Sequence, residues 1–295
     1  MEQHERDAKS LEPYDYLTKA PGKEFRNLFM DSLNDKLQID PKVLDTLKQV
    51  VSMLHNASLL IDDIEDESAT RRGAPTAHQV FGVPRTLNAG NYVYFLAMEQ
   101  LLGLPQSEQC LKVFTREMCN LHRGQGREIW WRDTQHVPTL GEYEAMVIDK
   151  TGGLFRLALQ LMEAHSLHTV GCQVVDRLAL YFQIRDDVIN LASPTYHKLK
   201  GYCEDITEGK LSFVVLTAMH SLEPRSSQDL LTVLQSKPTD KREIDKAMRL
   251  IRDSGAIARA LQYLAALERE LVGFSSSPTL ANLMRQLSSE LLECS

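Results

Sequence analysis

Residues 40–68 read DPKVLDTLKQVVSMLHNASLLIDDIEDES, and this stretch predicts one long helix that ends in a cluster of acids. Its apolar side chains recur every three or four positions, which is the period of a helix with one buried face. Asp40 is a favourable N-cap, and a proline at the next position is common in the first helical turn. The stretch therefore indicates a helical protein, and the remaining sequence repeats the pattern.

The same periodicity continues along the chain, with Pro, Gly or polar clusters between the segments. It predicts further helices over residues 84–102, 106–131, 139–165, 170–192, 207–220, 226–236, 240–253, 255–273 and 277–292. Convincing strands, linkers and repeats are absent from the sequence. We therefore expect one all-α domain over residues 1–295, built as a helical bundle.

The composition limits the class of partner. The 295 residues are 43% hydrophobic and 25% charged, which allows a sizeable core. A net charge of -7 argues against nucleic acid, because phosphate backbones attract basic surfaces. No apolar stretch approaches the ~20 residues of a membrane helix, and the start MEQHERDAKS resembles no targeting segment. We expect a cytoplasmic protein without a transmembrane segment, whose five scattered cysteines are reduced.

Five acids occupy the six positions from Asp62 to Glu67. Acids stabilise helix N-termini, whereas these lie near a C-terminus. Asp62 and Asp66 are one turn apart and face the same way, which costs roughly a few tenths of a kcal/mol unless a cation offsets it. Carboxylates on one face suit Mg²⁺, which commonly takes one or two of them and completes its shell with water and phosphate. A solvated acidic helix end is the alternative interpretation.

A second acidic pair stands in FQIRDDVIN, residues 182–190. Gln183 and Asn190 flank Asp186 at helical spacing, so an otherwise apolar helix would have one polar face. Polar groups on such a helix are costly unless they find partners. Two acidic helices that face each other would make a carboxylate-walled cavity, a geometry that helical bundles use for metal sites.

Basic side chains accompany both acidic motifs. Each alone is more commonly a surface charge, but diphosphates need several donors, and arginine has a fork that matches phosphate oxygens. The candidates are Lys23, Arg26, Arg71, Arg72, Lys150, Lys200 and Lys210.

Together these segments resemble the trans-prenyltransferases, and particularly the eukaryotic geranylgeranyl diphosphate synthases. The resemblance covers about residues 21–220 and rests on PGKEFR, MLHNASLLIDDIEDES, RRGAPTAH, NAGNYVYF, LHRGQGREIWWRD, DKTGGLF, YFQIRDDVINL and CEDITEGKLSF, in family order. It implies the isoprenoid synthase fold, a bundle around a deep central cavity, in a homodimer or larger homo-oligomer. Residues 1–20 would be loosely ordered or would contact a second copy.

The resemblance also implies roles for individual residues. About three Mg²⁺ ions would be bound by Asp62, Asp66 and Asp186, with Asp63 and Asp187 in support. The catalytic set would be these five aspartates and Lys150. The allylic diphosphate would be contacted by Arg71, Lys150, Thr151, Gln183, Lys200 and Lys210. Isopentenyl diphosphate would be held by Lys23, Arg26, His55 and Arg72.

The implied reaction is Mg²⁺-dependent elongation of dimethylallyl, geranyl or farnesyl diphosphate by isopentenyl diphosphate. Small residues, Ala57 and Ser58, precede the first motif and would leave the wall open to a growing chain. The resemblance assigns the floor to Tyr94, Phe95 and His122. A twenty-carbon product, geranylgeranyl diphosphate, fits these residues best.

Several alternatives remain on the sequence alone. The product could be farnesyl diphosphate or a chain of C25 or longer, or the chain could be the prenyltransferase half of a fused fungal terpene synthase. A catalytically idle regulatory subunit would not need both acidic pairs and all of the cations, and a terpene cyclase would not need a second diphosphate site. Farnesyl synthases commonly have a third Asp at the position of Asn190. The eukaryotic geranylgeranyl enzymes resemble this chain in having Asn there.

Overall fold

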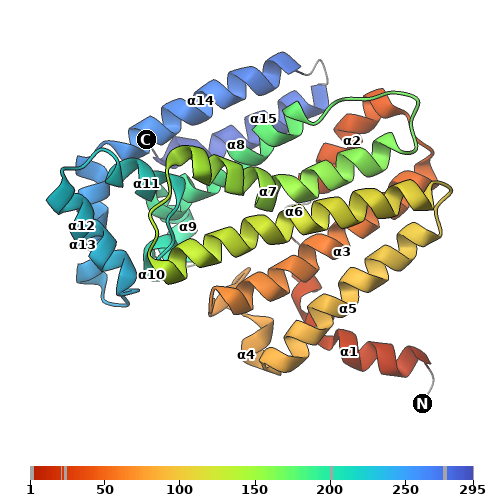
Figure 1. Ribbon diagram of the computed structural model, residues 1–295, viewed down its shortest axis with the longest axis horizontal. Helices are drawn as coiled ribbons and strands as arrows, with labels where there is room; N and C mark the ends of the chain where they lie inside the picture. Colours follow the sequence, from red (N-terminus) through yellow and green to blue (C-terminus); the bar gives the residue numbers. More distant parts are fainter. Residues whose placement is uncertain (1–2, 21, 23–24, 200–201, 275–277, 295) are drawn as a thin grey trace. The chain divides into compact units, whose positions relative to one another are not determined.

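The computed structural model describes residues 3–20, 22, 25–199, 202–274 and 278–294. Within these ranges it has fifteen α-helices, a two-stranded hairpin and a C-terminal 3-10 helix (Figure 1). The all-α class expected from the sequence is confirmed. The chain divides into two compact units, each described separately below.

The first unit comprises residues 1–119 and 154–172. Its complete elements are α1 (Gln3–Thr18), α2 (Phe25–Leu37), α3 (Pro41–Glu65), β1 (Thr70–Arg71), β2 (Ala74–Pro75), α4 (Ala77–Phe81) and α5 (Val83–Leu102). It also includes α6 (Ser107–Thr134) up to residue 119 and α7 (Leu140–Glu163) from residue 154. At its centre α3 packs against α5. A Cβ on Gly90 would lie 3.0 Å from the Ile61 side chain and 3.3 Å from the Ala57 carbonyl, so this glycine permits the close approach.

The long helix α3 begins where the sequence predicted. The Asp40 carboxylate accepts hydrogen bonds from the amides of Lys42 and Val43, at 2.9 and 3.3 Å. These bonds satisfy two of the amides that a helix start leaves unpaired. The acidic motif consequently falls at the other end of a helix of known register.

The N-terminal segment is helical over residues 3–18 and packs against α3 and α5. The hydroxyl of Tyr92 on α5 donates to Asp7 at 2.8 Å, and the Tyr16 hydroxyl donates to the Pro75 carbonyl at 2.9 Å. These bonds link α1 to α5 and the hairpin, and the expectation that residues 1–20 are loosely ordered stays a prediction. The contact of this segment with a second copy stays a prediction too.

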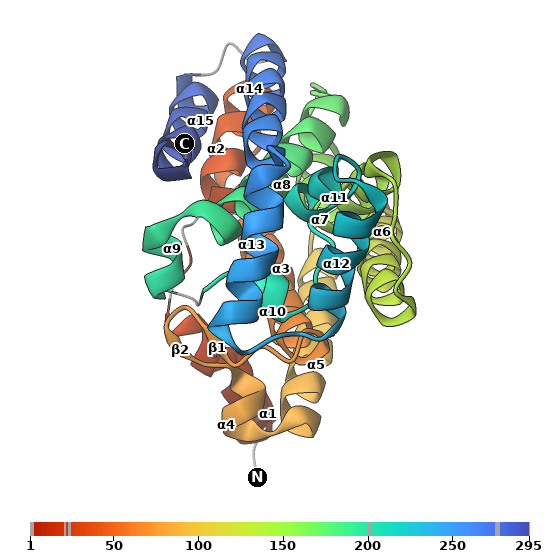
Figure 2. The ribbon, with the colours of Figure 1, turned by 90° about the vertical axis from the view of Figure 1, so that its left-hand side faces the viewer.

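The second unit comprises residues 120–153 and 173–295. It holds the remainder of α6 and α7 together with α8 (Gln173–Ala192), α9 (Pro194–Leu199), α10 (Glu204–Thr207), α11 (Phe213–Met219), α12 (Pro224–Gln235), α13 (Lys241–Asp253), α14 (Ala256–Phe274), α15 (Pro278–Ser289) and η1 (Glu290–Cys294). Helix α8 packs against α14, and α10, α12 and α13 lie side by side (Figure 2). Buried Arg185 of α8 donates to the Leu287 carbonyl at 3.1 Å and pairs with Glu290, which ties the C-terminal segment to α8.

The prediction of one helix over residues 207–220 was wrong. Helix α10 ends at Thr207 and α11 begins only at Phe213. Gly209 between them has a φ of +72°, and a Cβ there would lie 2.9 Å from the Leu234 carbonyl. A left-handed glycine breaks the helix because few other residues adopt that conformation without strain.

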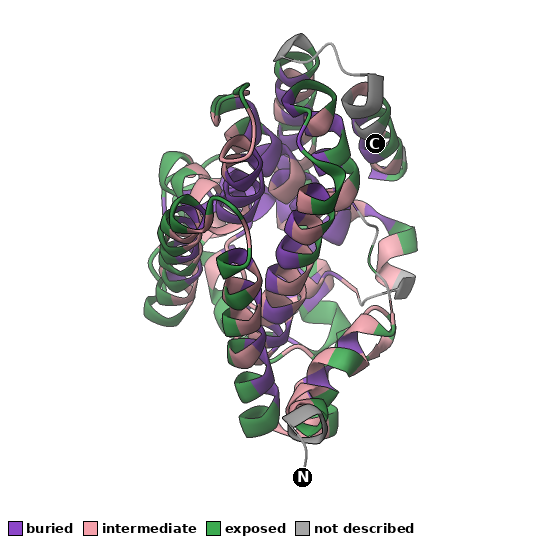
Figure 3. Ribbon diagram, turned by 90° about the vertical axis from the view of Figure 1, so that its right-hand side faces the viewer, coloured by how far each residue is buried: buried purple, intermediate pink, exposed green. Residues whose placement is uncertain are grey.

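Buried residues form the inward faces of the helices in both units (Figure 3). Among the described residues, no helix combines the length and the apolar character needed to cross a bilayer. The cytoplasmic location and the single domain stay predictions.

Candidate active site

The first acidic motif lies at the C-terminal end of α3. Asp62 and Asp63 are in its last turn, and Asp66 is the C-cap. Arg71 of β1 donates through Nε to Asp63 Oδ1 at 2.8 Å, its Nη2 bonds the same oxygen, and Nη2 lies 3.4 Å from Asp62 Oδ2. Arg71 is therefore the cation that acids at a helix C-terminus require.

The two adjacent aspartates differ in accessibility. The Asp63 side chain is 1% exposed, whereas that of Asp62 is 25% exposed. Burial raises the pKa of Asp63, and the charge and hydrogen bonds of Arg71 oppose that rise. Within the described chain, Asp63 Oδ2 has no hydrogen-bond partner. Asp62 is thus the accessible carboxylate, and Asp63 anchors the loop that follows.

The hairpin after α3 brings Arg71 back to the helix end. Arg72 and Gly73 at its turn have φ values of +54° and +78°, as in the two-residue turns that match the twist of a hairpin. The Ser68 amide donates to the Asp63 carbonyl at 3.0 Å, and the Thr76 hydroxyl donates to the Ser68 carbonyl at 2.8 Å. Local backbone bonds therefore place Arg71.

Three of the residues expected to bind isopentenyl diphosphate influence one another in the first unit. Burial lowers the pKa of His55 well below its usual value, and the positive charges of Arg26 and Arg72 lower it further. Arg72 donates to the Ala20 carbonyl and lies 3.4 Å from Asn56 Oδ1. The result is a basic region with a neutral histidine. Lys23, the fourth predicted residue, lies outside the described residues.

The small residues before the first motif have structural contacts of their own. Ala57 is fully buried beside α5, and Ser58 donates to the His55 carbonyl of its own helix at 2.8 Å. His122 on α6 is exposed. Their effect on product length stays a prediction.

Tyr94 of α5 lies near the acidic end of α3. Burial raises its pKa, and the negative charges of Glu65 and Asp62 raise it further. The adjacent Phe95 is 65% exposed in the single chain. Tyr94 and Phe95 therefore occupy different environments. Their expected role in limiting product length stays a prediction.

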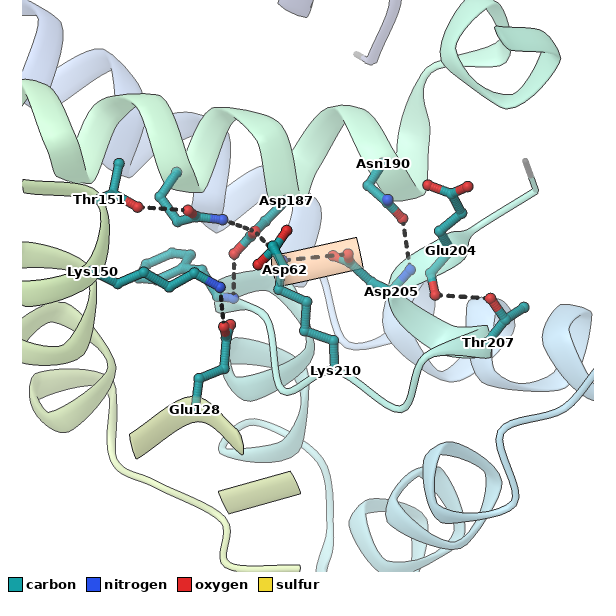
Figure 4. Close-up of polar contacts among 12 residues, drawn as sticks. Asp62, Glu128, Lys150, Thr151, Asp187, Asn190, Glu204, Asp205, Thr207 and Lys210 are labelled. Carbon is teal, nitrogen blue, oxygen red and sulfur yellow. Dashed lines mark hydrogen bonds and ion pairs between the residues drawn. The ribbon is translucent and has the colours of Figure 1, made fainter. Parts of the chain in front are cut away.

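The second acidic motif is built around Asp187 on α8, whose side chain is 1% exposed (Figure 4). Its Oδ2 accepts hydrogen bonds from the Tyr143 hydroxyl and, at 2.8 Å, from the Phe213 amide. Its Oδ1 accepts from Gln183 Nε2 at 3.0 Å and lies 3.9 Å from Lys210 Nζ. Asp187 is thus held on both oxygens.

Asp186, its neighbour, is the accessible member of the pair. The side chain is 48% exposed and accepts a hydrogen bond from Arg185 at 2.8 Å. The second motif therefore repeats the division found in the first, with one accessible aspartate followed by one buried aspartate.

The α7 residues expected at the allylic diphosphate lie beside α6 and α8 within the second unit. Thr151 donates to Gln183 Oε1 at 2.9 Å, and Lys150 pairs with Glu128 of α6 (Figure 4). A Cβ on Gly124 would lie 2.3 Å from the Lys150 amide nitrogen. This glycine therefore allows α6 and α7 to touch, which gives a structural reason for Gly124.

Lys210 lies near two buried carboxylates, Asp205 and Asp187, at 3.8 and 3.9 Å (Figure 4). Burial alone would lower the pKa of Lys210, but the carboxylates outweigh it and raise that pKa. Burial raises the pKa of Asp205 to about 8, against the opposing charge of Lys210. Asn190 Oδ1 accepts a hydrogen bond from the Asp205 amide at 3.0 Å, which ties α10 to α8. Lys200 lies outside the described residues.

Sequence reasoning missed Tyr143, Glu128 and Asp205. Tyr143 stands two helical turns before Lys150, a spacing that could have placed both on one face of a helix. Asp205 lies in the segment CEDITEGKLSF, five residues before the predicted Lys210. Glu128 carried no signal beyond its charge.

The carboxylates fit Mg²⁺ by their chemistry. In the part of the chain that the structure describes, no three His, Cys, Asp or Glu side chains converge as a closed metal site requires. Mg²⁺ does not need such a cage, because it binds one or two carboxylates and takes its other oxygens from water and substrate phosphate. The accessible side chains of Asp62 and Asp186 suit this mode.

The family model for polyprenyl synthetases matches residues 7–251. The chain belongs to the polyprenyl synthetase family. Polyprenyl synthetases are generally dependent on a divalent metal. The family resemblance drawn from the sequence is confirmed.

Three relatives of this polyprenyl synthetase show how far the similarity extends. A geranylgeranyl pyrophosphate synthase of Hypoxylon pulicicidum is 47% identical over 245 residues, covering 83% of this chain and 63% of the relative. Geranylgeranyl pyrophosphate synthase D of Phomopsis amygdali is 45% identical over 262 residues, covering 87% and 61%. A geranylgeranyl pyrophosphate synthase of Dictyostelium discoideum is 40% identical over 288 residues, covering 95% and 93%. The chain spans less than two thirds of the two fungal relatives and nearly all of the third.

Proposed function

We propose that this polyprenyl synthetase condenses isopentenyl diphosphate onto an allylic diphosphate and makes geranylgeranyl diphosphate. The family match over residues 7–251, together with relatives named as geranylgeranyl pyrophosphate synthases, carries this proposal. The starters would be dimethylallyl, geranyl and farnesyl diphosphates. The paired aspartates of the two units support the proposal because each pair has one accessible carboxylate.

About three Mg²⁺ ions would be held by Asp62, Asp66 and Asp186. When bound, they would neutralise the negative charge that grows on the leaving diphosphate. The buried aspartates of each pair would keep the accessible ones in place, Asp63 through Arg71 and Asp187 through its four neighbours. Arg71 itself, expected at the allylic diphosphate, would add positive charge beside Asp62.

The allylic diphosphate would be bound by Lys150, Thr151, Gln183, Lys200 and Lys210, and isopentenyl diphosphate by Lys23, Arg26, His55 and Arg72. A neutral His55 would contribute a hydrogen bond and leave the charge to the arginines. The allylic carbon–oxygen bond would break, and its electron pair would leave with the diphosphate. The double bond of isopentenyl diphosphate would then attack the allylic cation, and the released diphosphate would take the departing proton.

Product length would be limited near Tyr94, whose phenol lies close to the charges of Asp62 and Glu65. Its removal should mainly lengthen the product. The small side chains of Ala57 and Ser58, with Phe95 and His122, complete the set of residues that we propose to control length.

A homodimer or larger homo-oligomer is the proposed assembly. Apolar side chains are exposed along one side of α5, and large patches of this kind commonly mark interfaces between proteins. They belong to Val83, Leu87, Phe95 and Leu102.

The test is to incubate the purified chain with Mg²⁺, labelled isopentenyl diphosphate and each of the three allylic diphosphates, and to size the dephosphorylated products. A twenty-carbon alcohol that disappears with chelator supports the proposal. An alcohol of fifteen carbons, or of more than twenty, would support the proposed elongation reaction but contradict the proposed product length. No elongation from any starter overturns the activity and favours an idle regulatory subunit.

A further inference from the structure

The buried phenol of Tyr143 contacts the second acidic motif, and the function proposed above counts it only as one of the four neighbours of Asp187. Tyr143 is fully buried in the first turn of α7, and its hydroxyl donates to Asp187 Oδ2. Its ring packs against Phe213 with 5.8 Å between centroids, and the Phe213 amide donates to the same oxygen at 2.8 Å. Donors from α7 and α11 therefore converge on one carboxylate oxygen of α8.

The other oxygen of Asp187 is also connected to α7. It accepts from Gln183 Nε2 at 3.0 Å, and Gln183 Oε1 accepts from the Thr151 hydroxyl at 2.9 Å. Thr151 lies two turns after Tyr143 and hence on the same face of α7. The two ends of this hydrogen-bonded chain thus fix the side chain of Asp187 between two points of a single helix (Figure 4).

The start of α7 is itself fixed. The Thr139 amide donates to Glu142 Oε2 at 2.8 Å, and the Glu142 amide donates to Thr139 Oγ1 at 3.2 Å. This reciprocal pair is a capping box, which sets the first residue of a helix. Tyr143, whose amide donates to the Thr139 carbonyl at 3.0 Å, therefore has a set position.

We propose that Tyr143 is a positioning residue for Asp186: by holding Asp187, it fixes the orientation in which α8 presents the accessible carboxylate next to it. This inference rests on the proposed function, in which Asp186 binds Mg²⁺. Groups that hold a metal ligand from behind commonly change metal affinity or activity by about 10- to 100-fold when they are removed.

A purely structural role is the competing explanation, because a buried hydrogen bond to a carboxylate also stabilises the fold. The chain offers a matched control in Tyr263 of α14. Its hydroxyl donates to Glu144 of α7 at 2.8 Å, and its ring lies 5.2 Å from that of Phe213. Tyr263→Phe also removes a bond from a tyrosine hydroxyl to a carboxylate beside the Phe213 ring, at a half-buried position and without touching Asp187.

The experiment compares the full chain with its Tyr143→Phe and Tyr263→Phe variants. One readout is the Mg²⁺ concentration that gives half-maximal elongation, and the other, independent of turnover, is the rise in Tm on adding Mg²⁺ with inorganic diphosphate. Tyr143→Phe should raise the Mg²⁺ requirement about 10-fold or more and lose most of the Tm rise, whereas Tyr263→Phe should stay within about twofold of wild type. Wild-type values of both readouts in Tyr143→Phe would overturn the inference, whatever its Tm without ligand.

A rescue variant covers the case in which Tyr143→Phe does not fold. Replacement of Tyr143 by 4-aminophenylalanine keeps a donor on the ring and should restore a Mg²⁺ requirement and a Tm rise close to wild type. A full loss of both despite the retained donor contradicts the inference. If the wild-type chain elongates no starter yet is stabilised by Mg²⁺ with diphosphate, the proposed function fails, and the Tm comparison still decides the role of Tyr143.

Discussion

The two acidic pairs have the same order of exposure but are held by different means. Asp63 relies mainly on one cation, Arg71, and has one oxygen without a hydrogen-bond partner in the described chain. Asp187 has donors on both oxygens, two of them the neutral Tyr143 hydroxyl and Phe213 amide. The first pair thus depends on charge and the second on a network. We expect the free energy of unfolding to fall more when one residue is lost at the first pair than when one is lost at the second.

The largest effect should come from the accessible members of the two pairs. Asp62→Asn and Asp186→Asn should each lower kcat by about 10²- to 10³-fold, because each removes a negative ligand while keeping the shape of the side chain. Both variants should fold, since neither side chain is buried. Steady-state rates and circular dichroism check this, and wild-type rates in either variant would remove that aspartate from the metal site.

The next effect separates the two buried members. Arg71→Met would leave Asp63 buried without its cation and should lower the free energy of unfolding by about 3 kcal/mol. Tyr143→Phe leaves Asp187 its other donors and should cost about 1 to 2 kcal/mol. Urea unfolding measures both. Equal losses would show that the two pairs are held alike, and Asp63→Asn added to Arg71→Met should recover part of the loss.

A smaller effect tests how closely α6 must pack against α7 at Lys150. A Cβ on Gly124 would overlap the Lys150 backbone, whereas one on Gly126 would meet nothing within 4 Å. Gly124→Ala should therefore cost about 2 kcal/mol, while Gly126→Ala should be neutral or stabilise the helix by up to about 1 kcal/mol. Thermal unfolding of the two variants compares them, and similar Tm values would mean that α6 and α7 can separate at no cost.

The last effect concerns pH. Burial raises the folded-state pKa of Asp205 to about 8, whereas an unfolded aspartate titrates near 3.9. As pH rises between these values the unfolded state gives up its proton first, so the stability contributed by Asp205 declines and then levels off above about pH 8. The Tm of Asp205→Asn should fall less than that of wild type between about pH 5 and 8. Parallel pH profiles would contradict this assignment.

Much of the fold follows from short-range patterns in the sequence. Asp40 and Pro41 fixed the start of α3 because capping is local, and apolar periodicity predicted most of the later helices. Helix α2 was not predicted, although Phe29, Leu33 and Leu37 recur at helical spacing within it.

The site was predicted less completely, because its partners are distant in sequence. The acids near the end of α3 predicted a compensating cation, and Arg71 has that place, although the resemblance had assigned it to the substrate. The bond from Tyr143 to Asp187 spans 44 residues, and Gly209 is constrained by the Leu234 carbonyl. The spacing of apolar residues along one segment cannot predict contacts between residues so far apart in sequence.

The bond from Arg72 to the Ala20 carbonyl has a practical consequence for protein engineering. The carbonyl of Ala20, two residues after the end of α1, accepts a hydrogen bond from a side chain that we assign to isopentenyl diphosphate. A shortened protein that starts after residue 20 would lose this bond together with the packing of α1 on α3 and α5. We expect a higher KM for isopentenyl diphosphate, a change that assays at saturating substrate would overlook.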